Sequence, residues 1–166
     1  METILIKGSK KEEIYEEILP QLRALLEGEA DFVANMANAS SVLRVAFPGR
    51  FSWVGFYLMK GKELVLGPFQ GKPACVRIAV GKGVCGTAAA RRETIIVPDV
   101  ERFPGHIACD PDSRSEIVVP MLRGNRLIGV LDVDSNQLNE FDVIDERYLR
   151  QIVDVVLGAS AVETSD

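Results

Sequence analysis

The sequence predicts an α+β protein in which helices cover an antiparallel sheet, and three observations support this fold class. Segments with apolar residues at helical spacing stand at the two ends of the 166-residue chain. Short β-prone runs separated by turn residues fill the middle. Strands joined mainly by hairpins form antiparallel sheets. We therefore expect the terminal helices on one face, and a short helix and a long loop enclosing a pocket on the other.

Three longer helices are expected outside the strand-rich region. The first covers residues 10–27, where apolar residues recur on one face, and Pro20 is expected to kink it or break it in two. The second runs from 31 to 47 and ends before a Pro-Gly pair. The third closes the chain over residues 139–162 with one apolar side.

Six strands and a short helix are expected between these segments. The strands cover residues 51–58, 63–68, 74–80, 94–97, 116–123 and 126–135. The short Ala-rich helix covers 84–92, and residues 100–115 show no periodicity. Long ordered loops in compact domains are often functional, so this irregular segment is a candidate part of a site.

Composition and charge exclude several classes of protein. With 19 basic and 24 acidic residues the net charge is −5, which argues against nucleic acid as a partner. The longest apolar runs are far shorter than the roughly 20 residues of a membrane span. The N-terminus has no apolar segment typical of a secretion signal. We expect a single cytoplasmic domain over residues 1–166 that does not bind membranes.

The supply of cysteine and histidine limits the possible chemistry. There are three cysteines and one histidine, His106, and no C-x-x-C pair. An odd number of thiols in a reducing compartment argues against a static disulfide framework. A Cys₃His zinc site is conceivable, but the spacings do not resemble a zinc knuckle. We therefore expect neither a metal nor another cofactor.

Cys109 is the candidate nucleophile. It lies in the irregular segment, and a thiol is the most nucleophilic side chain available. His106 and Arg114 could favour its thiolate, whereas Asp110 would oppose it. The alternative is a small buried apolar residue, which is the usual role of a free cysteine. A polar loop is a poor place for such a residue, so the sequence favours the reactive interpretation.

The other two cysteines are ambiguous when each is taken alone. Cys85 is expected at a helix N-terminus, where the helix dipole favours a thiolate, but it could equally pack that helix against the sheet. Cys75 is expected in the middle of a strand and reads as a core residue. As a set the three could form a nucleophile and partners that resolve a sulfenic acid as a disulfide.

Three acidic residues fall on the predicted strands. Alternation puts Asp132 and Asp134 on one strand face, opposite Leu131 and Val133, and Glu116 could join them across the hairpin. A solvated strand face is the commoner outcome for such residues. Gathered in a pocket, they could bind an ammonium group or share a proton, because neighbouring negative charges raise a carboxyl pKa.

Two aromatic residues share a face of the first expected strand. Trp53 and Tyr57 are four residues apart, so their side chains point the same way. Packing within the sheet is the commoner role. The functional alternative is an aromatic wall around a small polarizable group.

Taken in order, five motifs resemble the single-domain GAF proteins that are free methionine-(R)-sulfoxide reductases. They are WVGFY at 53–57, GKGVCGTA at 81–88, GHIACD at 105–110, SEIV at 115–118 and IGVLDVDS at 128–135. The similarity runs from about residue 11 to about residue 156. The resemblance implies a GAF fold and the reduction of free L-methionine (R)-sulfoxide to methionine, with thioredoxin as the reductant.

The resemblance also implies roles for individual residues. Cys109 matches the catalytic thiol that becomes a sulfenic acid, and Cys75 and Cys85 match the two cysteines that resolve and relay the oxidation. Which of the two pairs first with Cys109 stays open. Glu116, Asp132 and Asp134 match the family's acidic residues that hold the substrate and its sulfoxide oxygen. Trp53 and Tyr57 match its aromatic residues near the substrate methyl group.

Two other functions remain as alternatives. A GAF domain can serve as a ligand-binding or redox-sensor module without turnover. A thiol peroxidase needs only an acidic thiol, and the acidic trio argues against it. The exposed faces of the terminal helices also make a homodimer a reasonable hypothesis.

Overall fold

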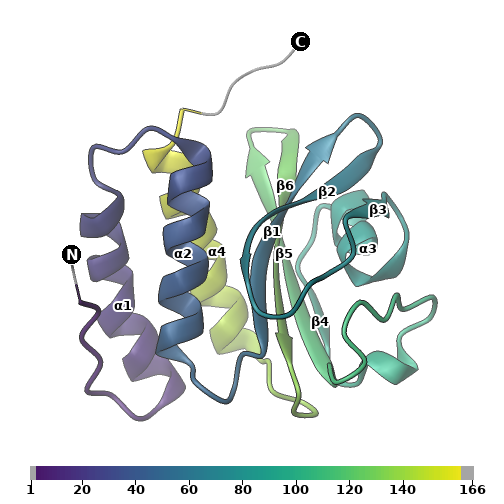
Figure 1. The fold of residues 1–166 in the computed structure, drawn as a ribbon, viewed down its shortest axis with the longest axis horizontal. Helices are drawn as coiled ribbons and strands as arrows, with labels where there is room; N and C mark the ends of the chain where they lie inside the picture. Colours follow the sequence, from purple (N-terminus) through teal and green to yellow (C-terminus); the bar gives the residue numbers. More distant parts are fainter. Residues whose placement is uncertain (1–2, 162–166) are drawn as a thin grey trace.

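A six-stranded sheet divides the protein into two layers, as the computed structural model of residues 3–161 shows (Figure 1). The strand order is β3-β2-β1-β6-β5-β4, and every neighbouring pair is antiparallel. The strands are β1 (Trp53–Lys60), β2 (Glu63–Gln70), β3 (Arg77–Ala79), β4 (Ile95–Val97), β5 (Ser115–Arg123) and β6 (Arg126–Ser135). The predicted antiparallel α+β fold is confirmed.

The terminal helices cover one face of this sheet (Figure 1). Helices α2 (Phe32–Ala46) and α4 (Val143–Ala159) lie on the strands, and α1 (Lys11–Leu26) packs against both from outside. The opposite face carries α3 (Gly83–Arg91) and the loop that contains the 3₁₀ turn Val100–Arg102. This division agrees with the sequence prediction.

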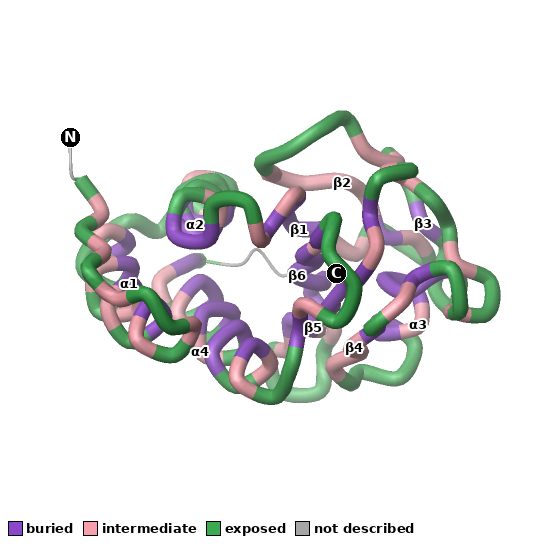
Figure 2. The backbone as a smooth tube through the Cα atoms, turned by 90° about the horizontal axis from the view of Figure 1, so that it is seen from below, coloured by how far each residue is buried: buried purple, intermediate pink, exposed green. Residues whose placement is uncertain are grey.

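The main core lies between the sheet and the terminal helices. Figure 2 shows buried stripes along these helices, with exposed residues on their outer sides. Ile117, Leu131 and Val133 face this layer, so their strand neighbours face the other one. The rings of Phe47 and Phe51 stack with centroids 4.3 Å apart and add to the same core. Burial of apolar area at about 25 cal/mol per Å² makes this layer the main source of stability.

The helix boundaries differ from the sequence prediction at two places. Helix α1 does not break at Pro20 but runs through it. Helix α4 begins at Val143 rather than at 139, because Asn139 has a positive φ of 55° and the Asp142 side chain caps the helix by accepting from the backbone N–H of Ile144. The predicted end of this helix, Val162, lies outside the described residues.

The smaller layer has its own core, which is formed by α3 and by strand side chains on the side of the sheet away from the terminal helices. Strand β3 is shorter than the predicted 74–80, since the chain before Arg77 leaves the sheet. Tyr57 donates its hydroxyl to the carbonyl of Cys75 at 2.9 Å and holds this part of the chain beside the sheet. Within residues 3–161, the structure contains no helix long and apolar enough to cross a membrane.

Candidate functional site

A pocket of about 520 Å³, counting its open mouth, lies between the sheet and α3. Most of the residues selected from the sequence line it: Trp53, Tyr57, Cys85, Cys109, Glu116, Asp132 and Asp134. The eighth, Cys75, is joined to the lining residue Cys109 by a disulfide. The structure thus brings all of the predicted site residues together.

The floor of the pocket carries the three acidic residues. Glu116 on β5 lies directly opposite Asp134 on β6, and Asp132 is two residues away on the same face. Glu116 and Asp132 are each only 6% exposed. The expectation of a solvated strand face is therefore wrong, because α3 and the loop cover this side of the sheet.

Burial and mutual repulsion keep these carboxyl groups from ionising easily. Burial is the main cause that raises the pKa of Glu116 and Asp134, and the neighbouring Asp132 adds to both shifts. Burial also raises the pKa of Asp132, to about 6, while hydrogen bonds with Cys85 and Glu116 act in the opposite direction. Ser113 donates its hydroxyl to Asp134 at 2.7 Å and partly offsets the shift there. Burial and mutual repulsion therefore both favour the protonated forms of these carboxyl groups.

Cys85 lies at the first turn of α3, as predicted, and faces the acids. The turn packs closely because position 86 is glycine: a Cβ there would lie 2.4 Å from the carbonyl oxygen of Ala79. The Cys85 Sγ is 3.9 Å from Glu116 Oε1. Burial first, and then Asp132 and Glu116, raise the pKa of Cys85. The hypothesis of a thiolate stabilised by the helix dipole is therefore wrong, and Cys85 is a buried neutral thiol.

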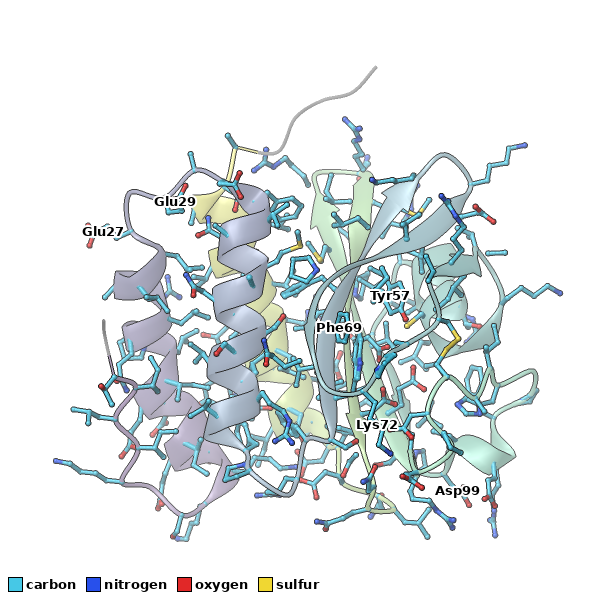
Figure 3. All side chains as sticks on the ribbon, in the orientation of Figure 1. Glu27, Glu29, Tyr57, Phe69, Lys72 and Asp99 are labelled. Atoms are coloured by element: carbon cyan, nitrogen blue, oxygen red, sulfur yellow. A yellow bond between two sulfur atoms is a disulfide. The ribbon has the colours of Figure 1, made fainter. Side chains whose placement is uncertain are left out.

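Cys109 forms a disulfide with Cys75, at a Cα–Cα distance of 5.4 Å and a sequence separation of 34 residues (Figure 3). Both residues are partly exposed. Cys109 is on the pocket wall, so the alternative of a buried apolar residue is wrong. The interpretation of Cys75 as a strand core residue is also wrong, since it lies just before β3. The Cys₃His zinc arrangement is not available while two of its thiols are bonded to each other.

Residues 71–76, which we call the strap, connect β2 to β3 and carry Cys75. Lys72 bridges the strap to the loop through Asp110, at 3.3 Å, and Asp112, at 2.5 Å. Trp53 donates its indole N–H to the carbonyl of Lys72 at 3.0 Å. Figure 3 shows Lys72 and Tyr57 on this side of the sheet, together with the disulfide. The disulfide therefore joins two segments that polar contacts already hold together.

The two aromatic residues serve both of the roles considered for them. Trp53 and Tyr57 belong to the smaller core, and their ring centroids lie 6.0 Å apart. They also line the pocket, so they form an apolar wall beside the acids.

The charged residues around Cys109 have other partners. His106 Nε2 is 3.9 Å from Glu116 Oε2, and burial lowers the pKa of His106. Arg114 pairs with Glu101 at 3.5 Å. Asp110 is paired with Lys72, which offsets the negative charge that was expected to oppose a thiolate.

Sequence reasoning missed Ser113 and Lys72. Both act through contacts between segments far apart in the chain, and no motif or periodicity marks them. It also missed a possible ligand set: Cys85, Glu116 and Asp132 each offer one metal-ligating atom, and these atoms lie within 4.8 Å of one another. The site thus combines a disulfide-bonded pair of cysteines with a cluster of buried carboxyl groups whose pKa values are raised.

Comparison with known proteins gives consistent results. A model of the GAF domain family matches residues 36–159. The chain is 57% identical to GAF domain-containing protein A of Dictyostelium discoideum, over 89% of this chain and 92% of that protein. It is 50% identical to the free methionine-R-sulfoxide reductase of Escherichia coli, over 86% of each.

Solved structures agree with these sequence relatives. The X-ray structure of free methionine-R-sulfoxide reductase from Neisseria meningitidis, in complex with its substrate, superposes with a TM-score of 0.92 at 46% identity. The similarity covers 96% of this chain and 95% of that one.

Proposed function

We propose, from the premise that this chain belongs to the free methionine-R-sulfoxide reductases of the GAF domain family, that it reduces free L-methionine (R)-sulfoxide to methionine with Cys109 as the nucleophile. One observation carries the proposal. The Cys75–Cys109 disulfide lies at the wall of a pocket whose floor holds three buried acids. A reductase of this kind needs a thiol pair and a proton donor at one place.

In the first step the sulfur of reduced Cys109 attacks the sulfoxide sulfur. The new bond between the Cys109 sulfur and the substrate sulfur then breaks together with the sulfur–oxygen bond of the substrate, as the protonated oxygen moves to Cys109. Methionine leaves, and Cys109 is left as a sulfenic acid. The oxygen gains negative charge during this transfer and needs a proton. One of the buried carboxyl groups supplies it, and the raised pKa values of the pocket acids favour the protonated form that can donate.

In the second step Cys75 resolves the sulfenic acid. Its thiol attacks the Cys109 sulfur, water leaves, and the disulfide forms. The 5.4 Å Cα–Cα distance of this pair supports Cys75, rather than Cys85, as the first resolving residue. Cys85 is buried and neutral, which makes it a poor attacking thiol, so we assign it a relay role only.

In the third step an external dithiol returns the enzyme to its starting state. Thioredoxin reduces the disulfide by thiol–disulfide exchange, so that two protein thiols reappear and one thioredoxin disulfide forms. The partly exposed position of both cysteines supports such an attack. Because thioredoxin is kept reduced in the cytoplasm, we propose that the enzyme works there.

The acid cluster supports selection of a free amino acid over a peptide. Glu116, Asp132 and Asp134 have no Lys or Arg ion-pair partner within residues 3–161. A free α-ammonium group would supply the missing positive charge, whereas the nitrogen of a peptide bond is neutral. Trp53 and Tyr57 would then pack against the substrate methyl group.

Single-turnover thiol counting tests the proposal. The reduced protein, freed of reductant, is mixed with free (R)- or (S)-methionine sulfoxide, and methionine and remaining thiols are measured. We expect the (R) epimer to yield one methionine with the loss of two thiols. The Cys109→Ser variant should yield none. Cys75→Ser should still yield one methionine but leave a sulfenic acid that a dimedone-type probe traps, and Cys85→Ala should form the disulfide.

The same experiment separates the alternatives. Turnover by Cys109→Ser would remove Cys109 as the nucleophile. Binding of the ligand without any methionine would favour the sensor module, and faster thiol loss with hydrogen peroxide than with methionine sulfoxide would favour a peroxidase. The homodimer stays a prediction, to be checked by sedimentation.

A further inference from the structure

The floor of the pocket offers a set of ligands that no reductase step requires to act together. We propose that Cys85, Glu116 and Asp132 form a binding site for Zn²⁺, and that the ion occupies it in competition with the substrate. One sulfur and two carboxylate oxygens converge there from α3, β5 and β6. The binding of zinc does not depend on the proposed function, whereas the competition with substrate rests on it.

The distances fit a zinc site after a small adjustment. The three ligand atoms lie within 4.8 Å of one another, and Cys85 Sγ is 3.9 Å from Glu116 Oε1. Zinc–sulfur and zinc–oxygen bonds of about 2.3 and 2.0 Å, at tetrahedral angles, put ligand atoms about 3.3–3.5 Å apart. The longest of these separations must therefore shrink by up to about 1.5 Å. Rotation of the side chains can supply this, so the regular elements that carry the three ligands need not move.

An unpartnered atom points independently to a ligand at this place. The Oδ1 atom of Asp132 is buried and has no hydrogen-bond partner, although the residue is only 6% exposed. Buried acceptors are almost always satisfied, and leaving one unpaired costs about 1–3 kcal/mol. Asp132 lines the pocket, so a positively charged group there would satisfy this atom.

The chemistry of the ligands favours zinc over harder ions. Thiolate sulfur selects zinc and its heavier relatives, whereas magnesium and calcium prefer oxygen-only sites. Three protein ligands leave a fourth position, which faces the pocket and can take water. The disulfide-bonded cysteines are not ligands, so the site is available whether Cys75 and Cys109 are oxidised or reduced.

Binding must release protons. The neutral thiol of Cys85 exchanges its proton for the zinc–sulfur bond, and any protonated carboxyl ligand does the same. Burial and nearby acids raise the pKa of Cys85, so protons compete strongly with the metal at low pH. We therefore expect zinc affinity to rise with pH.

The decisive experiment uses Cd²⁺ as a probe in the full-length Cys75→Ser/Cys109→Ser variant, where Cys85 is the only thiol. We expect an ultraviolet thiolate-to-metal charge-transfer band that saturates at one Cd²⁺ per chain, is reversed by chelator and is displaced by Zn²⁺. The same variant with Cys85→Ala should show no band. Absence of the band in the folded double variant would overturn the proposal.

Calorimetric titration with Zn²⁺ tests the two carboxylate ligands. In the same double variant, Asp132→Asn and Glu116→Gln should each weaken binding by about 100-fold or more, since even contacts behind the ligands are worth 10–100-fold. Asp134→Asn removes an equally buried acid outside the ligand set and should cost about tenfold or less. Equal losses at all three positions would mean general attraction by negative charge and would overturn the assigned site.

Enzyme kinetics test separately whether zinc competes with the substrate. With wild-type protein in chelator the reductase activity is measured first, and Zn²⁺ is then added at several substrate concentrations. We expect an increase in the apparent KM without a change in kcat. Full reductase activity that zinc does not inhibit would overturn the competition and leave the reductase proposal intact. A charge-transfer band in a protein that has no reductase activity would support the metal site and overturn the reductase proposal.

Discussion

Buried carboxyl groups on the two sides of the sheet differ in whether a cationic side chain is paired with them. On the helix face, Asp145 is fully buried but accepts hydrogen bonds from Lys11 Nζ at 2.5 Å, Tyr15 Oη at 2.8 Å and the backbone N–H of Asp142 at 2.9 Å. On the pocket face, Glu116 and Asp132 are nearly as buried but lack an ammonium or guanidinium partner within residues 3–161. His106 Nε2 comes within 3.9 Å of Glu116 Oε2, but burial lowers the pKa of this histidine.

This difference distinguishes Asp145, which has a structural role, from the pocket acids, to which we assign a function. Burying a charge without a partner costs several kcal/mol, so a stable fold normally supplies the partner, as it does for Asp145. Among residues 3–161 the pocket face supplies no such partner, and burial raises the pKa values of its acids. In the proposed reaction the bound substrate provides the missing positive charge. The following variants test the contrast, from the largest expected effect to the smallest.

Removing the partnered acid should destabilise the protein most. Asp145→Ala leaves Lys11 and Tyr15 without their shared partner, and breaking a buried ion pair costs about 3–5 kcal/mol. Urea unfolding at pH 7 measures this loss, and the folded variant should keep its kcat/KM. The exposed pair of Glu12 with Arg147 is the control, since Glu12→Ala should cost at most about 1 kcal/mol. Equal losses at both positions would contradict the structural role of Asp145.

Removing one of the pocket acids should lower the activity without lowering the stability. Glu116→Gln keeps the shape of the side chain but loses its acid function, so we expect kcat/KM to fall about 100-fold or more. The free energy of unfolding at pH 8 should stay the same or rise, because a neutral amide avoids the cost of a buried carboxylate. Steady-state kinetics and urea unfolding of the same preparation decide the matter. Wild-type kinetics would remove Glu116 from the mechanism.

The two faces should also differ in the sign of their pH dependence. The pKa of Asp132 rises from 3.8 to about 6 on folding, so its stabilising contribution is complete below pH 3.8 and is lost as pH rises through about 6. The free energy of unfolding of Asp132→Asn, relative to that of the wild type, should therefore increase by on the order of 1–3 kcal/mol between pH 4 and pH 8. Each unit of pKa shift corresponds to about 1.36 kcal/mol.

Asp142 provides the matched control on the helix face. Burial acts to raise its pKa, but the hydrogen bonds from Lys11 and from the backbone of Ile144 outweigh this effect and lower it. Its stabilising contribution is present above pH 3.8 and is lost as pH falls. Asp142→Asn should therefore be less stable than the wild type at neutral pH, and the deficit should shrink in acid. Parallel pH profiles for the Asp132 and Asp142 variants would contradict the contrast.

The sequence predicted which side chains share the pocket face, but it did not predict that this face is buried. Alternation with period two put Asp132 and Asp134 on one side and Leu131 and Val133 on the other, and the hairpin brought in Glu116. Alternation does not say which side will be covered, so the burial of the acids was not predicted. Covering depends on α3 and the loop, whose placement is a long-range property.

The cysteine pairing was out of reach of the sequence for a similar reason. The local environment suggested that Cys75 belonged to a strand, and it left Cys85 open between a thiolate and a residue that packs the helix against the sheet. The path of the strap decides the pairing instead. It runs beside the loop, where Lys72 contacts Asp110 and Asp112 and Cys75 is bonded to Cys109. Three cysteines allow three pairings, and neither spacing nor residue type ranks them.

The smallest expected effect concerns the contact that holds the strap to the sheet. Tyr57→Phe keeps the aromatic wall but removes the 2.9 Å hydrogen bond to the carbonyl of Cys75, which is worth about 1 kcal/mol. Loosening the strap should increase the rate at which a small dithiol reduces the Cys75–Cys109 disulfide by a few-fold, and kcat/KM should fall less than about tenfold. Tyr148→Phe, which loses a 3.3 Å contact with Glu16 on the helix face, should leave the reduction rate unchanged. If both variants increase that rate equally, the strap contact has no specific role, and access to the disulfide depends on the loop that carries Cys109.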